Sequence, residues 1–178
     1  MAKTKVATVW LDACAGCHMS FLDIDEAIIE LAGLVEFTRS PITDIKEFTP
    51  VDVGIVEGAV GNEDEEEVVK KLRENCKILM AWGDCACFGG IVSMRNLFDK
   101  EEVLRRCYVE SESTGKGKIP SSKDIPPLLD KVKRVDEVVK VDCYVPGCPP
   151  SAKAIKYALE ELLAGRIPIL PSEVMRFD

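Results

Sequence analysis

The chain has 178 residues, of which 47% are hydrophobic, and this is typical of a globular protein with a sizeable core rather than a disordered chain. Its 31 acidic against 23 basic residues give a formal net charge of −8, which argues against nucleic acid or an anionic membrane as the main partner. No apolar run approaches the roughly 18 residues of a membrane-spanning helix, and no signal-peptide pattern opens the chain, so we expect a cytoplasmic protein without membrane insertion.

Segments typical of strands and of helices alternate along the chain. Apolar runs predict strands, in chain order, at residues 6–11, 35–38, 51–57, 78–82 and 138–141. Apolar residues spaced at three and four predict helices over residues 19–32, over about 62–72, and from Ser151 to near Gly165. This alternation predicts an α/β fold, with a doubly wound parallel sheet and helices on both of its faces.

Residues 99–135 interrupt the alternation. They are charged and contain several glycines and prolines, so we expect a long surface excursion. The sequence contains no internal repeat and no low-complexity tract. We therefore expect a single domain over residues 1–178.

Three cysteine motifs follow predicted strands. Two thiols stand close together at Cys14 and Cys17, while Cys85 and Cys148 are single thiols on loops rich in glycine or proline. Because the carboxyl ends of parallel strands meet at one edge of a sheet, we expect these loops to meet there. A thiol pair with two distant single thiols can form a Cys₄ site for an iron–sulfur cluster. In a protein expected in the cytoplasm, metal or redox chemistry is also more typical of eight cysteines than disulfides.

The other candidate residues are less certain from sequence. Cys87 and Cys143 lie near predicted ligands and are possible substitutes for them, whereas Cys76 precedes a strand and is expected to be a core thiol. Cys107 has no predicted role. Glu57 ends the strand at 51–57 on the same edge, where its carboxylate is either a proton relay or an ordinary solvated or capping group.

Three other chemistries fit part of the cysteine pattern. Cys14-x-x-Cys17-His18 matches a c-type haem attachment site, but the sequence shows no export signal and Cys85 and Cys148 would have no role. A thioredoxin-like dithiol would need no further cysteines. A Cys₄ zinc site usually has two C-x-x-C pairs, and the second pair is absent. The cluster is therefore the favoured interpretation.

The motifs together resemble the small, electron-transferring subunit of nickel–iron hydrogenases, and the resemblance extends from residue 6 to about 164. The matching segments are Cys14-x-x-Cys17, Val56-Glu57-Gly58, Gly83-x-Cys85-Ala86-x-x-Gly89-Gly90 and Pro146-Gly147-Cys148-Pro149-Pro150. The resemblance implies a flavodoxin-like fold with one [4Fe–4S] cluster, proximal to the active site. It implies cluster ligands at Cys14, Cys17, Cys85 and Cys148, and a nickel–iron centre in a separate large subunit.

Many members of this family continue with cysteines and a histidine for two further clusters, which this sequence lacks. The chain is in this respect similar to the short, cytoplasmic small subunit of NAD(P)-reducing bidirectional hydrogenases, which residues 12–23 resemble in particular. That subgroup implies the reaction H₂ + NAD⁺ = NADH + H⁺, in which this chain is an electron relay without the catalytic metal centre. It also implies diaphorase partners that carry FMN and further clusters.

Other functions stay open on sequence grounds. The cluster-bearing subunit of respiratory complex I has the same fold, but it typically has an adjacent Cys-Cys pair in place of C-x-x-C. A flavodoxin-like module could bind FMN and use its cysteines as regulatory thiols, although no convincing phosphate-binding loop is present. A thiol oxidoreductase is a further possibility.

Overall fold

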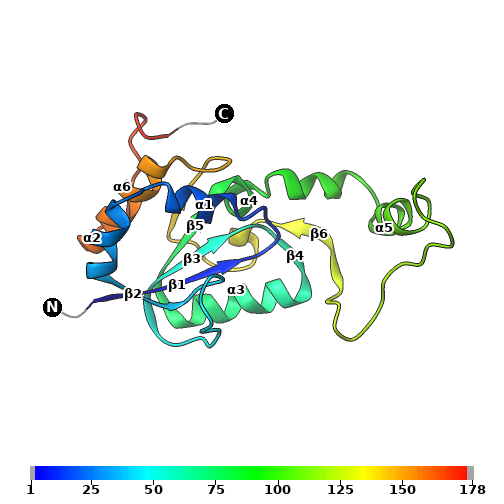
Figure 1. Ribbon diagram of the computed structural model, residues 1–178, viewed down its shortest axis with the longest axis horizontal. Coiled ribbons are helices and arrows are strands. Elements are labelled where there is room, and N and C mark those ends of the chain that lie inside the picture. Colours follow the sequence, from blue (N-terminus) through cyan, green and yellow to red (C-terminus); the bar gives the residue numbers. More distant parts are fainter. Residues whose placement is uncertain (1–2, 176–178) are drawn as a thin grey trace.

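A five-stranded parallel sheet forms the centre of the protein (Figure 1). The structure is a computed structural model that describes residues 3–175. The strands are β1 (Thr4–Trp10), β2 (Val35–Arg39), β3 (Val51–Glu57), β5 (Cys76–Trp82) and β7 (Cys143–Val145). Their spatial order is β2-β1-β3-β5-β7, and all neighbours run parallel. This is the 2-1-3-4-5 strand order of flavodoxin-like folds, which confirms the predicted fold class.

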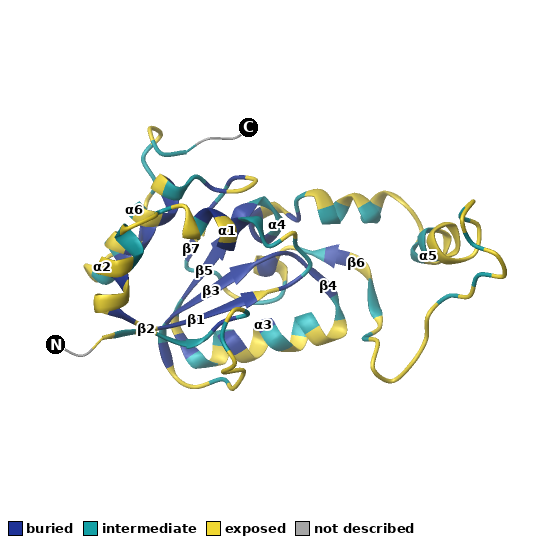
Figure 2. Ribbon diagram, viewed as in Figure 1, coloured by how far each residue is buried: buried dark blue, intermediate teal, exposed yellow. Residues whose placement is uncertain are grey.

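Helices cover both faces of the sheet. The helices α1 (Gly16–Leu22), α2 (Ala27–Leu34) and α6 (Ala152–Leu163) pack on one face, where residues such as Leu31 and Ile155 meet Ile55 of β3. The helices α3 (Glu63–Asn75) and α4 (Gly83–Phe88) pack on the other, where Leu72 meets Val56. Figure 2 shows the strands as the most deeply buried layer. Strands covered on both faces explain the near-continuous apolar runs of the sequence.

The last residues of four strands form one row across the sheet. In the β ladder Trp10 is paired with Glu57, Glu57 with Trp82, and Trp82 with Val145. The chain segments that follow β1, β3, β5 and β7 therefore all leave the sheet at the same edge. These are the segments that contain the predicted cysteine ligands and the glutamate motif.

The range 99–135 has structure of its own. It contains α5 (Lys100–Tyr108) and β6 (Leu128–Lys133), and η2 (Val135–Glu137) begins at its end. A 3₁₀ helix, η1 (Ile91–Leu97), leads toward α5, and Figure 1 shows the segment around α5 projecting away from the sheet. The strand β6 returns to the body and pairs antiparallel with β4 (Val60–Asn62), and Val132 and Val135 are buried there. No helix within residues 3–175 is long and apolar enough to cross a membrane.

Two predicted elements differ from the structure. The helix expected at 19–32 is two helices, because the chain turns between α1 and α2, where Asp25 has a left-handed φ of 53°. An aspartate tolerates this conformation better than most residues. The strand predicted at 138–141 is wrong: these valines pack from a loop against the core, and the strand begins only after Asp142, whose carboxylate accepts a hydrogen bond from the Leu79 N–H at 2.9 Å.

The predicted cap of the second helix can be tested directly. The Asn62 side chain accepts a hydrogen bond from the Glu65 N–H at 2.9 Å, and the Glu65 carboxylate accepts one from the Asn62 N–H, which is a capping box. We expect Asn62→Ala to lower the free energy of unfolding by about 1 kcal/mol, measured by urea denaturation. Lys71→Ala, which removes only an exposed ion pair with Glu67, should leave the denaturation midpoint nearly unchanged. Equal midpoints for the two variants would contradict the capping role.

Candidate metal centre

The four predicted cysteine ligands line one small cavity at the carboxyl edge of the sheet. The cavity has a volume of about 70 Å³, and its lining residues include the four thiols and the Glu57 side chain. Cys17 is buried at 8% exposure, Cys85 is half-buried, and Cys14 and Cys148 are exposed. Thiols that are far apart in sequence therefore surround a common space.

Glycines make room for two of the sulfur atoms. A Cβ atom at Gly83 would lie 2.3 Å from the Cys17 Sγ, and one at Gly90 would lie 2.7 Å from the Cys85 Sγ. Both glycines also have positive φ, at 78° and 50°, a region that other residues adopt only with strain. Any side chain at these two positions would displace a thiol from the cavity.

Hydrogen bonds between the loops hold this arrangement together. The Asp84 carboxylate accepts a hydrogen bond from the Gly147 N–H at 2.7 Å, and the Asp84 N–H donates to the Gly147 carbonyl at 2.9 Å. The Ser20 hydroxyl of α1 donates to the Pro150 carbonyl at 2.6 Å. The loop that carries Cys148 is thereby joined to both other cysteine motifs, so the thiols are positioned relative to one another before any ligand is considered.

Burial and mutual repulsion both oppose the thiolate form. Burial raises the pKa of the Cys17 thiol strongly, and the nearby negative charges of Glu57 and the other three cysteines raise this pKa further. Burial also raises the pKa of Cys85, although the Ile91 and Val92 N–H groups favour its thiolate. Four thiolates in this cavity therefore need a positive group between them, and none of the lining residues is basic.

The donor set and its surroundings fit an iron–sulfur cluster. Four soft thiolate ligands are what such a cluster requires, and the glycines allow the backbone to approach it closely. Among the His, Cys, Asp and Glu side chains of residues 3–175, no group of three or more is arranged to hold a single metal ion. The four thiols instead stand around the cavity wall.

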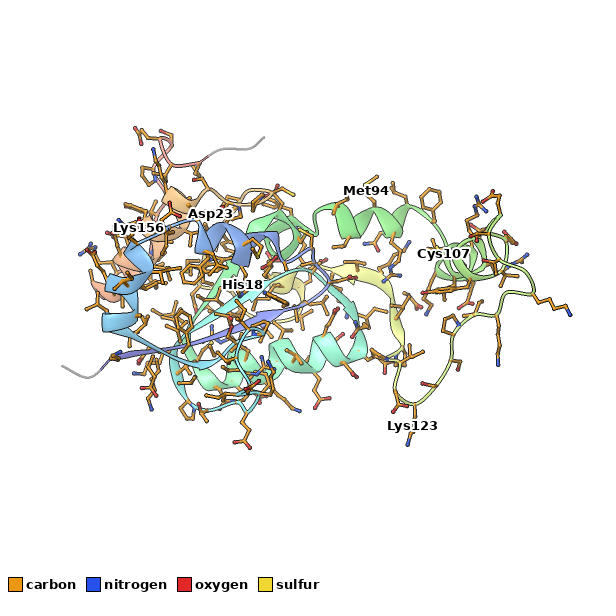
Figure 3. The ribbon with its side chains drawn as sticks, viewed as in Figure 1. His18, Asp23, Met94, Cys107, Lys123 and Lys156 are labelled. Carbon is orange, nitrogen blue, oxygen red and sulfur yellow. The ribbon has the colours of Figure 1, made fainter. Side chains whose placement is uncertain are left out.

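The other four cysteines do not line the cavity. Cys87 and Cys143 are buried in the two core clusters, and burial raises the pKa of each thiol to about 12. Cys76 is also buried, packed against Gly54 of β3. Figure 3 shows Cys107 on α5, well away from His18 and the sheet. The structure thus places neither possible substitute at the cavity.

His18 is the most consequential residue whose position the sequence did not indicate. It is 2% exposed and points from α1 toward the sheet (Figure 3), where its ring nitrogens contact the Glu57 carboxylate and the Thr8 hydroxyl. The contacts of Asp84 and Ser20 were also missed. An aspartate in a Gly-Asp-Cys turn is a recognisable signal for a backbone hydrogen bond, but nothing near Ser20 in the sequence indicates Pro150 as its partner.

Comparison with known proteins agrees with this geometry. The family described as NADH ubiquinone oxidoreductase, 20 Kd subunit, matches residues 14–162. The chain belongs to this family. The delta subunit of the NAD-reducing hydrogenase HoxS from Cupriavidus necator is 43% identical over 180 aligned residues, which cover 99% of this chain and 86% of that protein. The predicted resemblance to hydrogenase small subunits is thereby confirmed.

Further relatives show the extent of the shared domain. One chain of the F420-non-reducing hydrogenase vhu from Methanocaldococcus jannaschii is 42% identical over 96% of this protein, which spans only 60% of the length of that chain. A crystal structure of an NAD⁺-reducing [NiFe]-hydrogenase in the H₂-reduced state contains a chain that is 39% identical, with a TM-score of 0.97 over 99% of this chain and all of that one. The Ni-Fe-Se hydrogenase of Desulfomicrobium baculatum shares the fold, with a TM-score of 0.58 at 19% identity over 97% of this chain and 69% of that one.

The Asp84 contact offers a test of how the loops are held. Asp84→Ala removes the acceptor of the Gly147 N–H, and losing a hydrogen bond to a charged group costs about 1–3 kcal/mol. We expect a lower free energy of unfolding in urea and faster modification of Cys148 by a thiol reagent. Asp130→Ala, at an almost fully exposed carboxylate on β6, should change neither quantity. Unchanged Cys148 reactivity in Asp84→Ala would contradict the proposed link between the loops.

Proposed function

We propose that this chain is the small, electron-transferring subunit of an NAD(P)-reducing nickel–iron hydrogenase. The observation that carries the proposal is the set of four thiols around one cavity, in a chain that aligns along nearly its whole length with the Cupriavidus necator HoxS delta subunit. Cys14, Cys17, Cys85 and Cys148 would hold one [4Fe–4S] cluster. The complex would catalyse H₂ + NAD⁺ = NADH + H⁺ in the cytoplasm.

The catalytic parts of this reaction would belong to partner subunits. A large subunit would carry the nickel–iron centre, and diaphorase subunits would carry FMN and further clusters. When bound, a [4Fe–4S] cluster accepts and releases one electron at a time. The residues of this chain would fix the position of that group between the partners, and would set its potential through burial at Cys17 and through the N–H groups of Ile91 and Val92 beside Cys85.

A second function is favoured by the family match itself. The matching family is described by a subunit of NADH ubiquinone oxidoreductase, so a cluster-bearing subunit of a complex-I-like assembly is the alternative. Both functions are electron transfer, and both use a cluster at the carboxyl edge of the same sheet. They differ in whether the partner carries nickel, which gives a direct way to separate them.

The ligand assignment predicts the effect of one substitution. We expect Cys148→Ala to abolish most of the cluster iron and acid-labile sulfide, because a cubane needs all four thiolates. It should also abolish H₂-dependent reduction of NAD⁺ and the broad visible absorption that bleaches on reduction. Iron, sulfide and the absorption spectrum are measured on the anaerobically purified complex.

Cys107→Ala is the matched control, since this exposed thiol on α5 lies away from the cavity and its loss should change none of these quantities. Full cluster content in Cys148→Ala would overturn the assignment of Cys148. Resolved flavin bands in place of the cluster absorption would instead support an FMN-binding module.

Metal analysis of the native complex tests the hydrogenase assignment. We expect nickel, together with more iron than one cubane contains, in the complex that co-purifies with this chain under anaerobic conditions. Iron without nickel in an intact complex would contradict the hydrogenase function and favour the complex-I-like alternative. It would leave the four-cysteine cluster standing.

A further inference from the structure

We propose that Glu57 is a positioning residue that caps helix α1 from the neighbouring strand and thereby fixes the Cys14–Cys17 pair. The inference rests on the proposed function, because it concerns two cysteines taken there as cluster ligands. It assigns Glu57 a role different from the proton relay that the sequence suggested. The two roles predict different results for the same substitution.

Helix α1 has no cap of its own. The residue at its N-cap position, Ala15, has no side chain that can accept a hydrogen bond, and the first turn contains no acidic residue. The first N–H groups of any helix have no partner within the helix, and a buried N–H without an acceptor is costly. The start of α1 therefore needs an acceptor from elsewhere in the fold.

Glu57 supplies that acceptor from the end of β3. Its Oε1 accepts a hydrogen bond from the Cys17 N–H at 3.1 Å, and its Oε2 accepts one from the His18 N–H at 2.9 Å. These are the second and third residues of the helix, which a local capping side chain normally serves. The carboxylate also places its negative charge at the N-terminal end of the helix, where the helix dipole favours it.

The carboxylate is itself held in one orientation. The His18 Nδ1 contacts the Glu57 Oε2, and the other ring nitrogen lies 3.0 Å from the Thr8 Oγ1 of β1. The ring is enclosed by Trp10 and Trp82, whose ring centroids lie 5.3 Å and 5.6 Å from its own. Glu57 is 1% exposed, so no water competes for its oxygens. A fixed carboxylate of this kind can hold the N–H groups of α1 in a fixed place.

The contact acts directly on a proposed ligand. The Cys17 N–H is bound to Glu57, and the Cys17 sulfur lies where a Cβ atom at Gly83 would be. A shift of the α1 backbone would therefore move this sulfur against the loop that follows β5. Groups that orient a metal ligand in this way typically change metal affinity by about 10- to 100-fold when they are removed.

Glu57→Gln is the sharpest test, because it keeps the size of the side chain. The amide has one acceptor oxygen in place of two, and its NH₂ group would face one of the two backbone N–H donors. Asp142→Asn is the matched control. It makes the same chemical change at the amino-terminal end of β7, where the carboxylate accepts hydrogen bonds from the Leu79 N–H and from Arg73. That position is remote from the thiol cavity.

The measurements are made on the intact complex, purified anaerobically. We expect Glu57→Gln to lose cluster iron to a chelator about 10-fold faster than the wild type, with an altered EPR spectrum of the reduced cluster. Asp142→Asn should keep the wild-type values for both, even where its thermal stability is lower. Thr8→Val, which removes the partner of the second His18 nitrogen, should change the EPR spectrum in the same direction by a smaller amount.

The outcomes separate this inference from its alternatives. Wild-type chelation rate and EPR spectrum in both Glu57→Gln and Thr8→Val would overturn the positioning role. Slower H₂ turnover in Glu57→Gln with an unchanged cluster would also overturn it, and would support the proton relay. A wild-type complex without cluster iron would overturn the proposed function itself, which is a distinguishable failure.

Discussion

The protein depends on one constraint, which is that four parallel strands end in register at one edge of the sheet. Trp10, Glu57, Trp82 and Val145 form a continuous row of paired residues, and the chain leaves the sheet after each of them. A loop of a few residues is then enough to bring a thiol to the common cavity. No long connection has to fold back to build the site, so the accuracy of the site follows from the accuracy of the β ladder.

The site brings together groups that repel one another. Its thiols are close enough to disfavour ionisation, Glu57 adds a negative charge, and no basic side chain lines the cavity. The protein holds these groups in place with backbone hydrogen bonds and with glycines that leave space for sulfur, rather than with ion pairs. Such a cavity is poorly suited to four free thiolates and well suited to a group that carries positive metal ions.

The segment around α5 is the part of the chain that the sheet does not explain. Several large apolar side chains of η1 and its surroundings are exposed, among them Ile91, Met94 and Leu97. The chain of the NAD⁺-reducing hydrogenase that superimposes on 99% of this protein has the same overall path, so the projection is shared with that relative. Within the F420-non-reducing hydrogenases, by contrast, this protein corresponds to only part of the length of the matching chain.

The sequence by itself determined the alternation of strands and helices and the four cysteines that gather at the cavity. Hydrophobic periodicity and capping residues are local signals, and the position of a cysteine just after a strand predicts its edge of a parallel sheet. Only the tertiary structure decided that Cys87 and Cys143 face the core, that β7 begins after Asp142, and that Glu57 and His18 serve the start of α1. These outcomes depend on contacts between residues 39 or more positions apart, such as His18 with Glu57, or Leu79 with Asp142. No local pattern records such pairings, because they exist only once the strands have been ordered in the sheet.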